Sequence, residues 1–267
     1  KKFYFSNNSL INKRINFERI NLIQQQKSKI CLIMCQWKRF HTFNSIIQTI
    51  MNQTILVDVY IWNNNYDKKE DLVEILNNYK NANININIYL YNSPYNIKCI
   101  GRIITAHLLR YLYNKIIFFD DDEIMASEDV IETFDNETNQ YANTIFSWWA
   151  HNIISDTHFY KRINMQKNNN TIVNYGGGGG CIIPSKLFSI DFMNWLPYRY
   201  FNVEDLLCNI YIHHFMKGNV RASNANITFI KNESVSKDSM SFGYKLCDRT
   251  NIEIHKLKDM CLQWGIK

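Results

Sequence analysis

Strand-like and helix-like segments alternate along the first half of this 267-residue chain. The strand-like segments cover residues 28–36, 55–62 and 85–91, and the helix-like segments cover residues 39–52, 68–79 and 97–113. The first two helix-like segments repeat their apolar residues on one face, and the strict alternation of residues 85–91 predicts a half-exposed edge strand. Alternation of this kind predicts an α/β fold: a three-layer α/β/α sandwich with helices on both sides of a central, mostly parallel sheet.

The next strand-like segment ends in three consecutive aspartates. Ile116 to Phe119 form an apolar run, typical of a strand buried on both faces, and Asp120, Asp121 and Asp122 follow directly. The carboxyl ends of such strands are where open α/β sheets bind ligands. Adjacent carboxylates repel one another, so we expect a divalent cation to neutralise them. Oxygen-only ligands favour magnesium or manganese, which usually brings phosphates with it. The alternative is an acidic turn whose carboxylates are simply solvated.

Five consecutive glycines, Gly176–Gly180, stand directly before the strand-like residues 181–184. A glycine run costs conformational entropy and removes every side chain from the local surface, which suits a bulky ligand lying against the backbone. A flexible hairpin loop is the alternative. The run is not a phosphate-binding P-loop, because no Gly-Lys-Ser/Thr follows it.

The second half of the chain changes from alternating strands and helices to hairpin-like patterns. We expect a strand over residues 144–149, a hairpin formed by residues 159–165 and 171–175, and a strand over residues 223–230. This change predicts that the second half builds the acceptor side of a cleft.

A second acidic pair, Glu204 and Asp205, falls in the first turn of a predicted helix. At the edge of a cleft, one of these carboxylates could accept the proton of an attacking hydroxyl or stabilise positive charge at a reacting carbon. The alternative is structural: Asn202 would cap the helix, and the two carboxylates would interact with the helix dipole.

Composition limits the classes of partner and of compartment. The net charge of +6 is moderate and its basic residues are scattered, which favours a small anionic ligand over nucleic acid. No apolar run approaches the roughly 18 residues of a membrane span. The seven cysteines lack the CxxC pairs of a zinc site, and Cys31 and Cys35, on one predicted strand, indicate core thiols. Their pattern favours the cytoplasm slightly over secretion, although an anchor upstream of Lys1 would indicate the secretory lumen.

These motifs, in this order, resemble the GT-A class of nucleotide-sugar glycosyltransferases over about residues 29–230. The triple aspartate resembles the DxD motif, and together with the Trp62-Asn63-Asn64 turn it looks most like the exostosin-type transferases. The Glu204–Asp205 pair resembles the motif of a broad inverting family that includes many bacterial and viral sugar transferases. Two departures stand out: Gly101-Arg102 replaces the usual Asn-Arg before the DxD motif, and Gln36-Trp37 stands where Thr-Tyr-Asn is often seen.

The resemblance implies a Rossmann-like GT-A domain over residues 29–267, preceded by an N-terminal extension over residues 1–28. Residues 29–122 would bind the nucleotide-sugar and residues 123–267 the acceptor. It also implies roles for individual side chains. Asp122 would bind manganese, or magnesium, at the diphosphate, Asp120 would face the ribose or the metal, and Asp121 would lie near the donor sugar. Arg39 and Arg102 would pair with the diphosphate, and Asn64 would lie by the base or ribose. Asp205 with Glu204 would stand at the reacting centre, and the cleft would be lined by Gly178, Gly179 and Gly180.

The function implied is metal-dependent transfer of a sugar from a nucleoside-diphosphate sugar, a UDP-sugar in the first instance, to a hydroxyl of a glycan, protein or lipid. Inversion would use an aspartate base, whereas retention would place Asp205 beneath the anomeric carbon. Two alternatives remain: a nucleotidyltransferase or phosphohydrolase that uses the same aspartates, and a non-catalytic module that binds a nucleotide-sugar.

Overall fold

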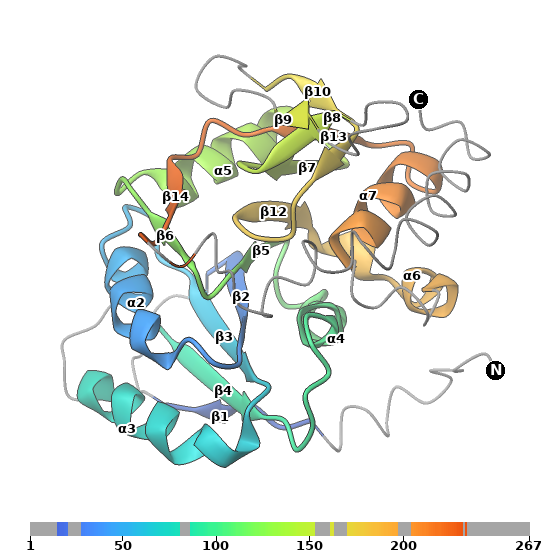
Figure 1. Ribbon diagram of the computed structural model, residues 1–267. Coiled ribbons are helices and arrows are strands. Elements are labelled where there is room, and N and C mark those ends of the chain that lie inside the picture. Colours follow the sequence, from blue (N-terminus) through green and yellow to red (C-terminus); the bar gives the residue numbers. More distant parts are fainter. Residues whose placement is uncertain are drawn as a thin grey trace.

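A nine-stranded sheet forms the centre of the computed structural model, which describes residues 15–20, 28–80, 86–152, 161–162, 170–196, 204–231 and 233. The strand order is β1-β4-β3-β2-β5-β12-β7-β13-β10 (Figure 1). These strands are β1 (Glu18–Arg19), β2 (Ile30–Gln36), β3 (Asp58–Asn63), β4 (Ile88–Asn92), β5 (Lys115–Phe119), β7 (Thr144–Ser147), β10 (Ile172–Val173), β12 (Cys181–Pro184) and β13 (Asn219–Ala222).

Six of these nine strands run in one direction. Strands β4, β3, β2 and β5 are parallel neighbours, and β7 is parallel to β13. Because β12 is antiparallel to both β5 and β7, the two parallel groups share one direction. The mostly parallel sheet expected from the sequence is therefore confirmed. Strand β1 pairs antiparallel with β4, so the predicted edge strand β4 has a neighbour on both sides.

Helices cover both faces of the sheet. One layer contains α2 (Phe43–Met51), α3 (Lys69–Lys80) and α5 (Val130–Gln140), and the other contains α4 (Ile100–Leu109), α6 (Ile190–Trp195) and α7 (Glu204–His214). Short 3-10 turns add η1 (Phe40–Thr42), η2 (Tyr66–Lys68) and η3 (Ser185–Phe188). In Figure 1, α2 and α3 lie to the left of the sheet, and α4, α6 and α7 lie to its right. This is the predicted three-layer α/β/α arrangement. No helix among the described residues is long and apolar enough to cross a membrane.

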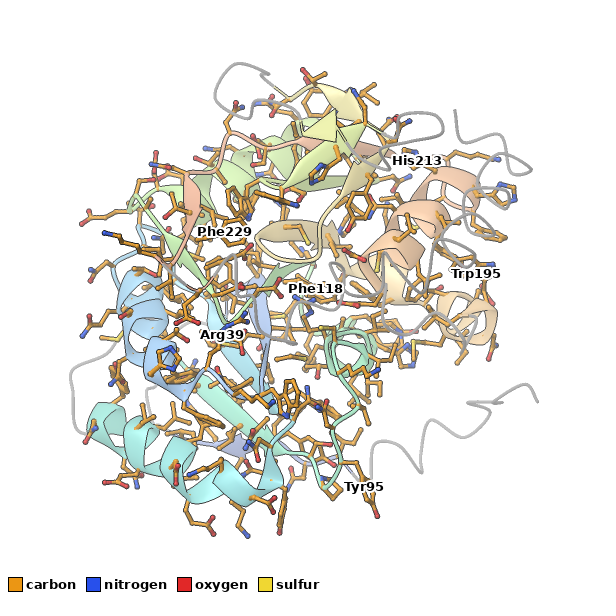
Figure 2. All side chains as sticks on the ribbon, in the orientation of Figure 1. Arg39, Tyr95, Phe118, Trp195, His213 and Phe229 are labelled. Atoms are coloured by element: carbon orange, nitrogen blue, oxygen red, sulfur yellow. The ribbon has the colours of Figure 1, made fainter. Side chains whose placement is uncertain are left out.

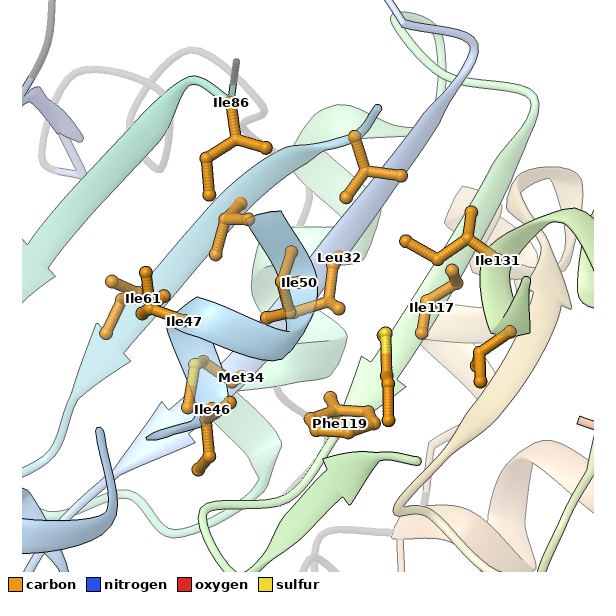
Figure 3. Close-up of a cluster of buried hydrophobic side chains, with 14 of the residues drawn as sticks. Leu32, Met34, Ile46, Ile47, Ile50, Ile61, Ile86, Ile117, Phe119 and Ile131 are labelled. Carbon is orange, nitrogen blue, oxygen red and sulfur yellow. The ribbon is translucent and has the colours of Figure 1, made fainter. Parts of the chain in front are cut away.

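The alternation of side chains along the central strands builds two separate cores. Leu32 of β2 and Ile117 of β5 point toward the layer of α2, whereas Ile33 and Phe118 point toward the layer of α4. All four are fully buried, and full burial of an apolar side chain of this size stabilises the fold by about 1.5–3 kcal/mol. Figure 3 shows the first core, where Leu32, Ile117 and their neighbours meet Ile46, Ile47 and Ile50 of α2.

Two smaller sheets correct two predictions. One contains β11 (Tyr175–Gly176), β8 (Ala150–Asn152) and β9 (Lys161–Arg162), and the other contains β14 (Ile227–Phe229) and β6 (Glu123–Met125). The described parts of the predicted hairpin do not pair with each other, because β9 pairs with β8 and β10 pairs with β13. The rest of that hairpin, residues 159–160 and 163–169, lies outside the described residues. The strand predicted over residues 223–230 is confirmed only in its second half, because β14 begins at Ile227 and residues 223–226 form no strand.

The reversed strand β12 brings the glycine run to the site. Cys181 at the start of β12 is paired with Phe118 near the end of β5. Because β12 runs antiparallel to its neighbours, the start of β12 lies at the edge of the sheet where the neighbouring strands end. The loop before β12 therefore lies beside the loops that follow those strands. Gly176–Gly180 therefore lie at the same edge of the sheet as Asp120–Asp122.

Candidate active site

The three aspartates after β5 are divided between two arginines. Asp121 accepts a hydrogen bond from Nη1 of Arg39 at 2.7 Å, and Asp122 lies 3.3 Å from Nη2 of the same side chain. Asp120 turns the other way and pairs with Nη1 of Arg102 at 2.5 Å. Figure 2 labels Arg39 and also Phe118, the residue two positions before Asp120. The aspartate motif thus belongs to two adjoining ionic groups.

Arg102 is the centre of the first group and is only 3% exposed. Its Nη1 donates to Asp120 and to the carbonyl oxygen of Gly178 at 3.0 Å, and its Nη2 donates to Oε1 of Glu204 at 2.5 Å. The guanidinium also lies over the ring of Phe118, 5.3 Å from its centroid. One cation therefore joins the first turn of α4, the end of β5, the glycine run and the first turn of α7.

The two carboxylates at the start of α7 have different surroundings. Glu204 is 3% exposed, and burial raises its pKa to about 7, although the charge of Arg102 opposes the shift. Asp205 is less buried and accepts hydrogen bonds from the hydroxyl of Tyr175 and from the backbone N–H of Leu206. Burial also raises the pKa of Asp205. Asn202, the alternative cap of this helix, lies outside the described residues.

Glu123 is a site residue that the sequence analysis missed. It is 2% exposed and accepts a hydrogen bond from Nε1 of Trp148 at 2.9 Å and from the backbone N–H of Asp120 at 3.3 Å. Burial raises its pKa, and the charges of Asp120 and Asp122 raise it further. The available signal was its position as the fourth consecutive acidic residue, Asp-Asp-Asp-Glu.

The glycine run makes room for the side chains of the site. A Cβ on Gly179 would lie 2.5 Å from Oε1 of Glu123 and 2.6 Å from Oδ2 of Asp120. A Cβ on Gly178 would lie 3.0 Å from Cβ of Asp205. Gly180 has φ of +51°, and a Cβ there would lie 2.1 Å from the Trp148 ring. The sequence predicted a close approach to this backbone by a ligand, and in the structure protein side chains approach it.

Arg39 and Asn64 lie outside the group around Arg102. Besides its aspartates, Arg39 contacts Glu233, whose carboxylate lies 3.2 Å from Nε of Arg39 and 2.8 Å from Nε2 of His41. Asn64 is buried directly after β3, where its side chain donates to the carbonyl of Lys98 at 3.0 Å and accepts from the N–H of Ile97 at 3.1 Å. Asn64 therefore fixes the loop that precedes α4.

The balance of charge at this edge of the sheet is acidic. Seven carboxylates lie around Arg39 and Arg102: Asp121, Asp122 and Glu233 pair with Arg39, Asp120 and Glu204 pair with Arg102, and Glu123 and Asp205 lie beside them. Burial, followed by the charge of Asp120, raises the pKa of Asp122 to about 7. Within the described ranges, no three histidine, cysteine, aspartate or glutamate side chains converge well enough to hold a metal ion. Magnesium is commonly held by one or two carboxylates together with phosphate oxygens, and manganese has the same preference for oxygen ligands. The oxygen-only donor set fits that mode of binding.

Comparison with known proteins identifies the fold. No protein-family model matches the chain, and no curated protein matches it. Among solved structures, it resembles TarS 1–349 of S. aureus in complex with UDP-GlcNAc, with a TM-score of 0.54, 11% identity, and coverage of 77% of this chain and 59% of TarS 1–349. It also resembles the mannosyltransferase PcManGT from Pyrobaculum calidifontis in complex with GDP-Man and Mn²⁺, with a TM-score of 0.51, 11% identity, and coverage of 74% and 57%.

A third similar structure is GalNAc-T7 with UDP, GalNAc and Mn²⁺, with a TM-score of 0.53, 12% identity, and coverage of 75% of this chain and 43% of GalNAc-T7. The chain thus spans 43–59% of the length of these three structures. At such identities the likeness defines the fold, which is the GT-A fold predicted from the motifs.

Proposed function

We propose that this chain is a metal-dependent glycosyltransferase that moves a sugar from a nucleoside-diphosphate sugar, a UDP-sugar in the first instance, to a hydroxyl of a glycan, protein or lipid. One observation carries the proposal: Arg102 joins Asp120 to Glu204 through two 2.5 Å ion pairs. The aspartate motif and the acidic pair of α7, recognised separately in the sequence, therefore share one site on a GT-A fold. The ligands named for the similar structures, UDP-GlcNAc, GDP-Man and UDP with GalNAc, support this class of donor.

Asp122 and Asp120 would hold the cation, Mn²⁺ or Mg²⁺. Bound there, the cation would stabilise the negative charge that develops on the departing diphosphate. Mn²⁺ in two of the similar structures supports this assignment. Asp122 suits the role because its carboxylate is largely desolvated and lies near other acids, so a cation would relieve an existing repulsion.

The other site residues have distinct proposed roles. Asp205 would accept the proton of the attacking hydroxyl in an inverting reaction, and its raised pKa brings it closer to the range of an effective base. Buried Arg102 would fix Asp120 and Glu204 beneath the diphosphate, and Arg39 would contact the diphosphate in exchange for one of its carboxylate partners. Asp121 would lie near the donor sugar, Asn64 would lie by the base or ribose, and Gly178, Gly179 and Gly180 would present their backbone to the substrates.

Donor binding and turnover can be tested in one series. UDP- and GDP-sugars are added with Mn²⁺ or with a chelator, and the melting temperature is recorded, because a ligand that binds only the native state stabilises it by about 2.7 kcal/mol at 100 times its dissociation constant. We expect one sugar nucleotide to stabilise the protein only with metal. The products should be a nucleoside diphosphate and a glycoside, whereas a nucleoside monophosphate and a sugar phosphate would identify a nucleotidyltransferase or phosphohydrolase.

The Asp122→Asn variant tests the metal assignment. It keeps the shape of the side chain and removes its charge, so the metal-dependent rise in melting temperature should be lost and the rate of transfer should fall by about 100-fold or more, since several kcal/mol of charge stabilisation is lost. Asp71→Asn is the matched control, because Asp71 lies on α3, away from the site, and forms an exposed ion pair with Lys68. Unchanged transfer by Asp122→Asn would refute the assignment.

A further inference from the structure

The hydroxyl of Tyr175 donates a hydrogen bond to Oδ2 of Asp205. Tyr175 stands on β11, directly before the glycine run. We propose that Tyr175 is a positioning residue that holds the Asp205 carboxylate ionised and in one orientation for proton abstraction. This inference rests on the base role of Asp205 proposed above and adds a residue to it.

Both oxygens of the Asp205 carboxylate have a donor. Oδ1 accepts from the backbone N–H of Leu206 at 2.7 Å, and Oδ2 accepts from Tyr175. Rotation of the carboxylate would break one of these bonds, and a hydrogen bond to a charged group contributes about 1.5–3 kcal/mol. Leu206 is part of the same helix, so Tyr175 supplies the contact that fixes the side chain relative to the rest of the site.

Asn209 holds the donor in place. It lies one helical turn after Asp205 and is buried. Its side chain donates to the carbonyl of Gly176 at 2.8 Å and accepts from the N–H of Gly176 at 2.9 Å. The same amide donates to the backbone carbonyl of Asp205 at 2.5 Å. The strand that carries Tyr175 is therefore attached to the helix that carries Asp205.

Several charged or titratable groups surround Asp205. They are Tyr175, Glu204, Arg102, Asp120, Cys181 and Cys208. Burial raises the pKa of Asp205, and the hydrogen bond from Tyr175 is the strongest of the effects that lower it. Removing the tyrosine hydroxyl deletes that effect and leaves the ring, which is 8% exposed, in place.

The Tyr175→Phe variant tests the proposal through its pH dependence. The acid limb of the rate profile should move to higher pH, with rates about tenfold lower on that limb, which corresponds to a loss of about 1.4 kcal/mol, and similar rates at alkaline pH. The carboxyl ¹³C resonance of Asp205, assigned with Asp205→Asn, should titrate at higher pH in Tyr175→Phe. Tyr60→Phe is the matched control. Tyr60 lies on β3, and the substitution removes a buried hydroxyl that is hydrogen-bonded to the hydroxyl of Tyr113 at 3.0 Å.

An Asp205 resonance that titrates at the same pH in wild type and in folded Tyr175→Phe would overturn the proposal. A second measurement needs no variant of Tyr175: in the wild type, the Cζ resonance of Tyr175 should follow the titration of Asp205, and this response should disappear in Asp205→Asn. Absence of the response in the wild type also overturns the proposal. If these titrations behave as expected but no donor is turned over, the contact of Tyr175 with Asp205 stands and the transferase function fails.

Discussion

Arg102 is surrounded by groups that would repel one another without it. Asp120 and Glu204 both lie within 2.5 Å of its guanidinium, and Glu204 is almost completely buried. A buried ion pair is often no more stabilising than an apolar pair of the same size, but removing one partner leaves the other charge uncompensated. The loss of stability on removing Arg102 should therefore exceed the net contribution of its ion pairs to the stability of the intact protein.

Replacement of Arg102 by alanine should destabilise the protein by about 3–5 kcal/mol, measured by chemical denaturation at pH 8, because buried Glu204 would lose its counter-ion and would have to stay uncompensated or take up a proton. The Lys68→Ala control removes one cation from the exposed pair with Asp71, and it should leave the free energy of unfolding almost unchanged. Equal losses in the two variants would contradict the role assigned to Arg102.

Sequence reasoning identified the residues of the site better than their partners. The aspartates were visible because they follow an uninterrupted apolar run, Ile116 to Phe119. The contact between Arg102 and Glu204 was not visible, since 102 positions separate the two residues. Glu123 could not be assigned to the site because a glutamate after an aspartate run is equally typical of a solvated turn, and Tyr175 could not because a tyrosine before a glycine run matches no functional pattern.

The glycine run acts as one element that packs against three parts of the site. Gly178 faces the acidic pair of α7, Gly179 faces Asp120 and Glu123, and Gly180 faces Trp148. The three positions tolerate a methyl group to different degrees, because the space and the backbone conformation differ at each.

Gly180→Ala should be the most destabilising substitution of the run. Its φ of +51° costs about 1–2 kcal/mol for an L-residue, and overpacking against Trp148 adds about 1–3 kcal/mol. Gly178→Ala should cost less, because φ at Gly178 is ordinary and its new Cβ would meet Asp205 at 3.0 Å, although it would displace the acidic pair and slow turnover. Melting temperatures and rates of both variants check this order, and a Gly178→Ala less stable than Gly180→Ala would contradict it.

At the level of elements, the sequence predicted strands and helices more reliably than their pairing. Strand β5 and helix α2 were expected where they occur, because each has a local pattern of apolar residues. The pairing of β9 with β8, and of β10 with β13, was not expected. Pairing depends on contacts between distant segments, and alternation within a strand does not specify its partner.

At the scale of the molecule, the described residues form two cores and, between them at one edge of the sheet, a group of desolvated carboxylates. Burial raises the pKa of Glu204 and of Asp122 to about 7, and it also raises the pKa of Glu123. The pKa of each of these groups is close to its ordinary value in the unfolded chain, so the folded state binds protons more tightly than the unfolded state. Their contribution to stability is present at low pH and is lost as the pH rises through about 7.

The free energy of unfolding should therefore rise as the pH is lowered from about 7.5 toward about 5. Glu204→Gln should flatten this dependence, because the amide keeps the shape of the side chain and does not titrate. Glu70→Gln, an exposed position on α3, is the control and should leave the dependence unchanged. Denaturation midpoints over this pH range provide the measurement. If stability changed with pH equally steeply in Glu204→Gln and in the wild type, Glu204 would be excluded as a source of the pH dependence.

The contact between Arg102 and Glu204 also constrains the order in which the protein can assemble during synthesis. The arginine leaves the ribosome about a hundred residues before the glutamate, with only Asp120 close to it in the chain. If the guanidinium were buried before Glu204 is synthesised, one of its two counter-ions would be missing and the burial would be unfavourable. The state in which α4 remains hydrated until α7 has been synthesised therefore has the lower free energy. The last helix of the described chain would then complete both the second layer and the site, and a ribosome-stalled chain that ends before residue 204 should present Arg102 to solvent.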